Sequence, residues 1–155
     1  MKATFHEKDS RATTILERIH IDVCGPFSVA LKTKHMYYVI FVDEFSRKCW
    51  IFFMQKKSET YSKFCEFKAL VEKESGKQVK ALRSDNGGEF ISGEFKDFCS
   101  AKGIRRELIA PHNPQQNGVA ERKNRTIVGA AQVMLHDQGL PIHLWAEACN
   151  TTVYV

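Results

Sequence analysis

The stretch that decides the fold reads IHIDVCGP and spans residues 19–26. Isoleucine or valine occupies every second position, and His20, Asp22 and Cys24 stand between them. This alternation predicts a β-strand with two distinct faces, which the Gly25-Pro26 pair ends. Acidic residues are depleted inside strands and are costly to bury without a partner, so the position of Asp22 calls for a functional explanation.

Downstream of this strand, the sequence predicts two more strands in close succession. Residues 36–42 are a continuous β-branched and aromatic run, too short for a convincing helix and apolar enough for the middle of a sheet. A polar turn follows at residues 43–47, and residues 49–54 return as a third strand. We expect the second and third strands to form an antiparallel hairpin.

Helices and strands alternate after the hairpin. We expect a helix that Ser58 caps and that ends before Gly76, and a second helix from Ser92 or Glu94 to Lys102. Further strands are expected at 79–84 and 104–109, and a long helix after an irregular loop at 110–118. The order β-β-β-α-β-α-β-α predicts an α/β fold. Its five-stranded mixed sheet has three antiparallel strands followed by two parallel ones, with helices on its faces.

The length of 155 residues suits one globular domain. We interpret residues 1–17 as a basic N-terminal arm or linker and residues 18–155 as the domain. An apolar segment at 144–154 begins a further element without a terminating signal before Val155, so we expect the domain to be truncated at its C-terminus.

Composition narrows the classes of partner. No apolar run approaches the roughly 18 residues of a membrane span, and residues 1–18 lack the apolar stretch of a secretory signal. The net charge of +5 modestly favours an anionic partner. No two cysteines have zinc-knuckle spacing, so we expect no zinc and interpret the thiols as reduced core residues of an intracellular protein. These five cysteines are Cys24, Cys49, Cys65, Cys99 and Cys149.

Three acids lie on separate predicted elements: Asp22 in the first strand, Asp85 after the fourth, and Glu121 early in the long helix. If the first and fourth strands are neighbours, the two aspartates face each other and the helix adds Glu121. Carboxylates this close repel one another, so the cluster makes sense around a cation, and oxygen ligands suit Mg²⁺ or Mn²⁺. Two such ions about 4 Å apart support displacement at phosphorus.

Each acid also has a purely structural interpretation. Asp85 begins an Asp-Asn-Gly-Gly turn, and Glu121 could pair with Arg125 one helical turn away for about 0.5 kcal/mol.

Three strings, IHIDVCGP at 19–26, SDNGGEF at 84–90 and PHNPQQNGVAER at 111–122, resemble the integrase core of long-terminal-repeat retroelements. FVDEFSR at 41–47 and ERKNRTI at 121–127 look like the copia branch of that family. Between Asp85 and Glu121 lie 35 residues, the interval that names the Asp-Asp-35-Glu polynucleotidyl transferases. The resemblance covers about residues 17–154.

The resemblance implies a ribonuclease H-like fold and a metal-dependent endonuclease and strand-transfer activity that inserts element DNA into a target duplex. It also implies that the catalytic ligands of two Mg²⁺ or Mn²⁺ ions are Asp22, Asp85 and Glu121. It further implies a homodimer or higher oligomer, and action in the nucleus after assembly in cytoplasmic virus-like particles. The DNA contacts that it implies are Asn86, His112, Gln115, Gln116, Asn117, Arg122, Lys123 and Arg125.

The chain departs from the family pattern at both ends. A full-length integrase of this kind has an N-terminal His-His-Cys-Cys zinc module, whereas this chain has only His6 and no cysteine before Cys24. The C-terminal DNA-binding region is also missing. Two alternatives stay open: an inactive or domesticated fragment that binds nucleic acid or dimerises, and a ribonuclease H-type nuclease, which the 111–121 loop does not favour.

Overall fold

A computed structural model describes residues 10–26, 37–85, 87–109 and 118–137. Two single 3-10 turns, Lys57–Glu59 and Gly88–Phe90, accompany the main elements. The main elements are β1 (Ile19–Cys24), β2 (Tyr37–Asp43), β3 (Cys49–Met54), α1 (Thr60–Ser75), β4 (Ala81–Ser84), α2 (Gly93–Ala101), β5 (Arg105–Leu108) and α3 (Gly118–Asp137).

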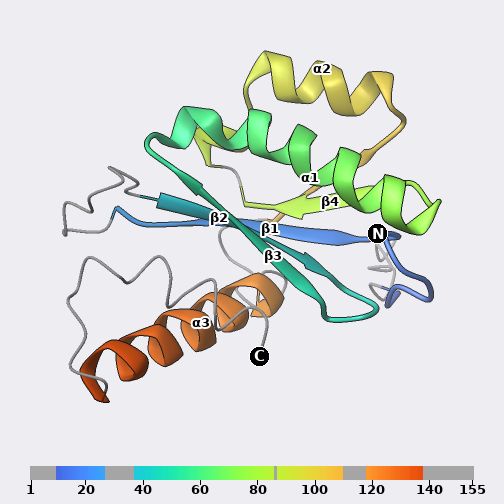
Figure 1. Ribbon diagram of the computed structural model, residues 1–155. Coiled ribbons are helices and arrows are strands. Elements are labelled where there is room, and N and C mark those ends of the chain that lie inside the picture. The colour runs from blue at the N-terminus through green and yellow to red at the C-terminus, as the bar shows by residue number, and fades with distance from the viewer. Residues whose placement is uncertain (1–9, 27–36, 86, 110–117, 138–155) are drawn as a thin grey trace, which may run out of the picture.

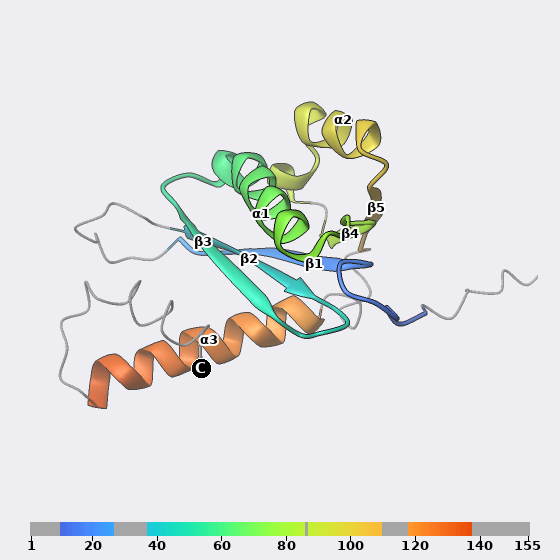
Figure 2. The same ribbon diagram turned by 45° about the vertical axis from the view of Figure 1, so that its right-hand side comes forward.

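The strands form one mixed sheet in the order β3-β2-β1-β4-β5. β1 pairs with β2 and β2 with β3 in antiparallel fashion, while β4 runs parallel to both β1 and β5. Helices α1 and α2 cover one face, and α3 crosses the other face (Figures 1 and 2). The predicted α/β fold is therefore confirmed, with three antiparallel strands followed by two parallel ones.

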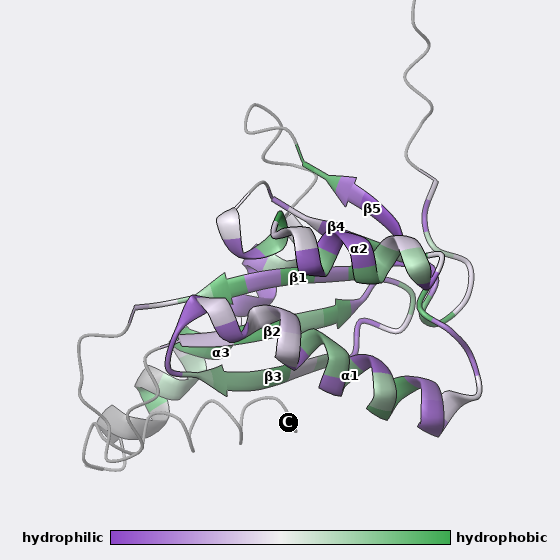
Figure 3. Cartoon of the chain, turned by 90° about the horizontal axis from the view of Figure 1, so that it is seen from above, coloured by the Kyte–Doolittle hydropathy of each residue, from purple (hydrophilic) through white to green (hydrophobic). Residues whose placement is uncertain are grey.

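Strand alternation divides the core between the two faces of the sheet. Ile19, Ile21 and Phe41 point toward α1, where the ring of Phe41 stacks on Phe67 with centroids 4.2 Å apart. The opposite cluster joins Tyr38, Ile40 and Val42 to three residues of α3. Figure 3 shows the inner strand β2 as largely hydrophobic and the edge strand β5 as mainly hydrophilic. Those three α3 residues are Ala120, Ile127 and Ala131.

Local signals set the helix ends. Gly76 takes a left-handed conformation, with φ 71°, and its amide donates a hydrogen bond to the backbone carbonyl of Glu72 at the end of α1. The Ser92 side chain accepts a hydrogen bond from the Phe95 amide and so caps α2, as its predicted role at the start of that helix requires. None of the described helices is long and apolar enough to cross a bilayer.

Three expectations about the elements were wrong. Ser58 does not cap α1, because Glu59 accepts hydrogen bonds from the Gln55 and Lys56 amides and holds residues 57–59 in a 3-10 turn before the helix begins at Thr60. The fourth and fifth strands are shorter than predicted. Of the cysteines expected in the core, Cys99 is buried and three others are only half-buried. Cys149 lies outside the described residues. The half-buried thiols are Cys24, Cys49 and Cys65.

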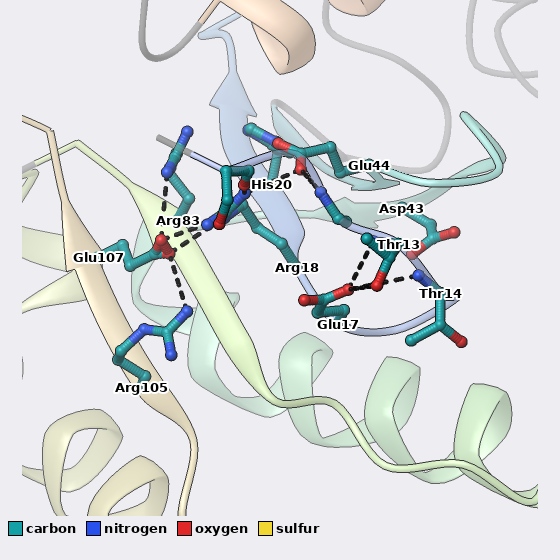
Figure 4. A network of polar contacts seen from close by, with 12 residues as sticks. Thr13, Thr14, Glu17, Arg18, His20, Asp43, Glu44, Arg83, Arg105 and Glu107 are labelled. Carbon is teal, nitrogen blue, oxygen red and sulfur yellow. Dashed lines mark hydrogen bonds and ion pairs between the residues drawn. The ribbon is translucent and has the colours of Figure 1, made fainter. Parts of the chain in front are cut away.

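A network of buried charges fastens residues 10–18 to the sheet (Figure 4). Arg18 bonds Glu44 at 2.8 Å and Glu107 at 3.1 Å, and so links the β2–β3 turn to β5 across β1. Arg83 of β4 also reaches Glu107 at 3.1 Å. Burial would raise the pKa of Glu44, but hydrogen bonds from the Ala12 amide and from His20 and the charge of Arg18 lower that pKa to about 2. Part of the predicted arm, residues 10–17, is thus tied to the domain.

The stacked aromatic core generates a stability prediction. Phe67→Ala removes a fully buried ring and leaves a cavity beside Phe41, so the free energy of unfolding should fall by about 3–5 kcal/mol. Leu70→Ala on the same helix is the matched control, because Leu70 is 41% exposed, and it should cost much less. Equal losses for the two variants in urea unfolding would contradict this packing.

Candidate active site

The register of β1 and β4 places the two predicted catalytic aspartates at the same end of these strands. His20 of β1 pairs with Arg83 of β4 in the parallel ladder. Asp22 follows two residues later on β1, and Asp85 follows two residues later just beyond β4. Asp22 lies on the face of β1 that α3 covers, and Asp85 comes directly after the end of β4.

Helix α3 supplies the third acid. The Asn124 side-chain amide donates a 2.8 Å hydrogen bond to Asp22 Oδ2, which fixes the first turns of α3 over β1. Glu121 lies one turn earlier on the same helix, and its side chain is 54% exposed. Glu121 therefore lies at the exposed edge of the interface between α3 and β1, which contains Asp22.

The three carboxylates share one electrostatic environment. Burial and, to a smaller extent, the charges of Asp85 and Glu121 together raise the pKa of Asp22 to about 6, although hydrogen bonds from Asn124 and the Val23 amide act to lower it. Carboxylates perturb one another in this way only at short range, because exposed charges are screened within about 8–10 Å. That the three acids gather around one metal site stays a prediction.

The donor set suits a hard divalent cation, yet the ligands are not assembled. Among the described residues, no three histidine, cysteine or acidic side chains are arranged to hold one metal ion. Asp85 Oδ1 accepts from the Gly87 amide at 2.7 Å, and Glu121 Oε1 faces Arg125 at 3.5 Å. An exposed pair of this kind is worth about 0–1 kcal/mol, so the Glu121 side chain can rotate toward the aspartates at little cost.

The predicted DNA contacts fall into separate groups. Arg125 faces Glu121, as the structural interpretation of Glu121 anticipated. Arg122 is exposed and Lys123 half-buried, and both line a hollow on another flank of α3. The structure therefore does not bring the three basic residues of α3 onto one surface. Asn86, His112, Gln115, Gln116 and Asn117 lie outside the described residues.

Sequence reasoning missed Asn124. It is buried with 7% exposure, and within the described part of the chain its Oδ1 atom accepts no hydrogen bond. The signal was present in the helical phase, because Asn124 lies four residues after Ala120 and three before Ile127, inside the buried stripe. A polar residue in such a stripe indicates a buried polar partner, which here is Asp22.

Comparisons with known proteins identify the family of the chain. The integrase core domain family matches residues 13–114. The Pol polyprotein of tobacco transposon TNT 1-94 is 44% identical over 99% of this chain, and that of Arabidopsis thaliana transposon RE2 is 35% identical. The chain spans 12% and 10% of these relatives' lengths. The predicted resemblance to copia-type retrotransposon integrase cores is confirmed.

Solved structures show the same fold. The HTLV-2 integrase catalytic core domain in complex with magnesium superimposes with a TM-score of 0.68 at 24% identity, covering 93% of this chain and 86% of that one. A chain of a simian T-cell lymphotropic virus intasome, in complex with PP2A regulatory subunit B56 gamma, gives 0.74 at 21% identity, covering 94% and 49%. The predicted ribonuclease H-like fold is confirmed.

The raised pKa of Asp22 predicts how stability depends on pH. The folded chain holds this proton up to about pH 6, whereas the unfolded chain releases it near the ordinary value of 3.8, so stability is lost as pH rises through that window. Relative to Asp22→Asn, the wild type should lose on the order of 2–3 kcal/mol between pH 4 and 7. Urea unfolding in metal-free buffer measures the difference. Asp97→Asn, exposed on α2, is the control, and a pH-independent gap for Asp22→Asn would contradict the assignment.

The contact from Asn124 predicts a second pKa effect. Asn124→Ala removes a donor that stabilises the ionised form of Asp22, so the Asp22 pKa should rise above its wild-type value. Carboxyl ¹³C titration by NMR reports this value directly. Thr126→Ala, an exposed change two residues away, should leave it unaltered, and a fall in the pKa for Asn124→Ala would rule out the hydrogen bond.

Proposed function

Because the chain belongs to the integrase core domain family, we propose that it is the catalytic core of a retrotransposon integrase that cleaves DNA and joins element DNA to a target duplex. The supporting observation is that Asp85 and Glu121, distant from Asp22 in sequence, lie close enough for their charges to raise the pKa of its half-buried carboxyl group. Such a cluster costs stability unless it binds a cation, so its presence favours a metal-dependent function.

In this proposal Asp22, Asp85 and Glu121 hold two Mg²⁺ or Mn²⁺ ions. When bound, such ions supply activation of the attacking oxygen and stabilisation of the leaving oxygen. The chain itself provides orientation. Asn124 and the Val23 amide fix the Asp22 carboxylate, and the Gly87 amide fixes that of Asp85. The described residues thus fit the donor chemistry, with Glu121 as the ligand that must turn.

Arg125 would couple DNA binding to this rotation. Its side chain is 77% exposed, and among the residues that the structure describes it pairs with Glu121 alone, at 3.5 Å. A phosphate is a stronger bidentate partner than a loosely paired carboxylate. Transfer of Arg125 to the DNA backbone would therefore release Glu121 toward the two aspartates. The contacts predicted for Asn86, His112, Gln115, Gln116 and Asn117 stay part of the proposal.

We also propose that the chain works as a homodimer or higher oligomer on DNA in the nucleus. The HTLV-2 integrase core domain has been solved in dimeric and trimeric forms, and the simian viral relative in an intasome. These assemblies support an oligomeric state for a chain with the same fold.

A second candidate is a non-catalytic fragment that binds nucleic acid. It is favoured by the lack of an assembled three-ligand group among the residues that the structure describes. Metal affinity separates the two candidates. Calorimetric Mn²⁺ binding that Asp22→Ala abolishes supports the enzyme, whereas salt-sensitive DNA binding without Mn²⁺ affinity supports the fragment.

Asp85→Asn tests the proposed catalysis. With Mn²⁺ or Mg²⁺ present, the wild type should nick duplex DNA or join its ends, and Asp85→Asn should reduce the rate roughly 10³-fold or more because a charged ligand is lost. Product formation on labelled oligonucleotides gives the rates. Asp97→Asn removes the same charge from exposed α2 and should keep wild-type activity. Unchanged activity in Asp85→Asn would refute the proposal.

A further inference from the structure

The FVDEFSR segment contains two acids with structural roles. Asp43 Oδ1 accepts from the Leu16 amide at 2.9 Å, and its Oδ2 accepts from both the amide and the hydroxyl of Ser46. The backbone carbonyl of Asp43 accepts from the Arg47 amide at 2.8 Å. Glu44 forms an ion pair with Arg18 in the buried charge network. The β2–β3 turn is therefore held rigidly from both sides.

Phe45 and Arg47 of the same turn have no comparable role. Phe45 is 54% exposed, and the exposed Arg47 side chain has neither a hydrogen bond nor an ion pair within the described ranges. Arg47 also has a left-handed backbone, with φ 64°, which costs a residue with a Cβ atom about 1–2 kcal/mol. The turn thus carries a conformational cost at Arg47, whose side chain has no partner among the described residues.

Arg47 lines two hollows that meet at its side chain. One, of about 290 Å³, is bordered by Arg11, Ala12, Glu44 and Phe45. The other, of about 310 Å³, is bordered by residues of the first two turns of α3. We call the two together the hairpin groove. The α3 residues that line it are Val119, Arg122, Lys123 and Thr126.

The charges along the hairpin groove are almost all positive and unpaired. Arg11, Arg47, Arg122 and Lys123 line it, and none forms an ion pair in the part of the chain that the structure describes. Glu44 is the acid on its wall, but Arg18 and His20 already occupy its carboxylate. The groove therefore presents a row of available cations to an anionic ligand.

The hairpin groove is separate from the candidate active site. At about 100° per residue, Lys123 and Thr126 project roughly 140–160° from Glu121 around α3, whereas Arg122, the sequence neighbour of Glu121, projects about 100° from it. A ligand held between Arg47, Lys123 and Thr126 would therefore lie on another side of α3 from Glu121.

We propose that the hairpin groove binds a single-stranded segment of DNA, with its phosphates on Arg47, Arg122 and Lys123 and one base stacked on Phe45. A row of cations favours a polyanion over a small anion, and an exposed aromatic ring beside such a row is the platform that unpaired bases use. This site rests on the proposed function for its choice of DNA. It adds a binding position for a DNA strand on a different side of α3 from Glu121.

Arg47→Gln tests the electrostatic half of the proposal. The probe is a fluorescent single-stranded oligonucleotide of about 16 nucleotides, titrated by anisotropy without metal between roughly 50 and 200 mM salt. The variant should bind more weakly, and its slope of log affinity against log salt should fall by about one. Lys96→Gln, on α2 across the sheet, makes the same charge change and should match the wild type. Identical behaviour of the two variants would overturn the groove.

Two further variants separate binding from folding. Arg47→Gly relieves the left-handed strain, so it should raise the thermal midpoint and yet weaken DNA binding. Phe45→Ala should weaken single-strand binding about tenfold with an unchanged salt slope, and should affect the matching duplex less. An equal loss on single strand and duplex, or no loss, would overturn the stacking contact.

The failure of the groove can be told apart from failure of the proposed catalysis. If the chain never nicks DNA but Arg47→Gln still loses affinity, catalysis fails and the groove stands. If the chain nicks DNA and Arg47→Gln binds as Lys96→Gln does, the groove fails and catalysis stands.

Discussion

The structure depends on the burial of one negative charge, the carboxylate of Asp22, between the sheet and α3. Burial and two neighbouring acids raise its pKa to about 6, so the ionised form is costly near neutral pH. Asn124 offsets part of this cost with a 2.8 Å hydrogen bond and at the same time fixes the helix that carries Glu121. The hydrogen bond that stabilises the Asp22 carboxylate thus also positions the helix that carries Glu121.

The other charged side chains discussed above form two groups, one paired and one unpaired. The buried pairs around Arg18, Glu44 and Glu107 join the N-terminal segment, the β2–β3 turn and β5 across one face of the sheet. The cations at Arg47, Arg122 and Lys123 stay unpaired within the described residues. Because both groups meet at the β2–β3 turn, the rigid network supports the turn that displays Arg47.

Local signals were sufficient for the element order. Alternation located β1, and glycines at 76 and 103, both with left-handed backbones, ended the helices where predicted. The same signals failed at the start of α1, where a competing local contact prevails: the carboxylate of Glu59, rather than Ser58, accepts hydrogen bonds from the amides of Gln55 and Lys56. The thiols of Cys24, Cys49 and Cys65 are only half-buried because their depth follows from sheet packing and not from their apolar character.

The sequence by itself determined the strands, the helices and the three acids, because periodicity, capping and motif spacing are properties of neighbouring residues. Only the tertiary structure decided that β4 lies beside β1, with His20 paired to Arg83, so that Asp22 and Asp85 come at the same end of the two strands. It also revealed Asn124 as the buried partner and separated Arg125 from Lys123 on α3. Strand register and helix rotation depend on packing between distant segments, which a local pattern does not encode.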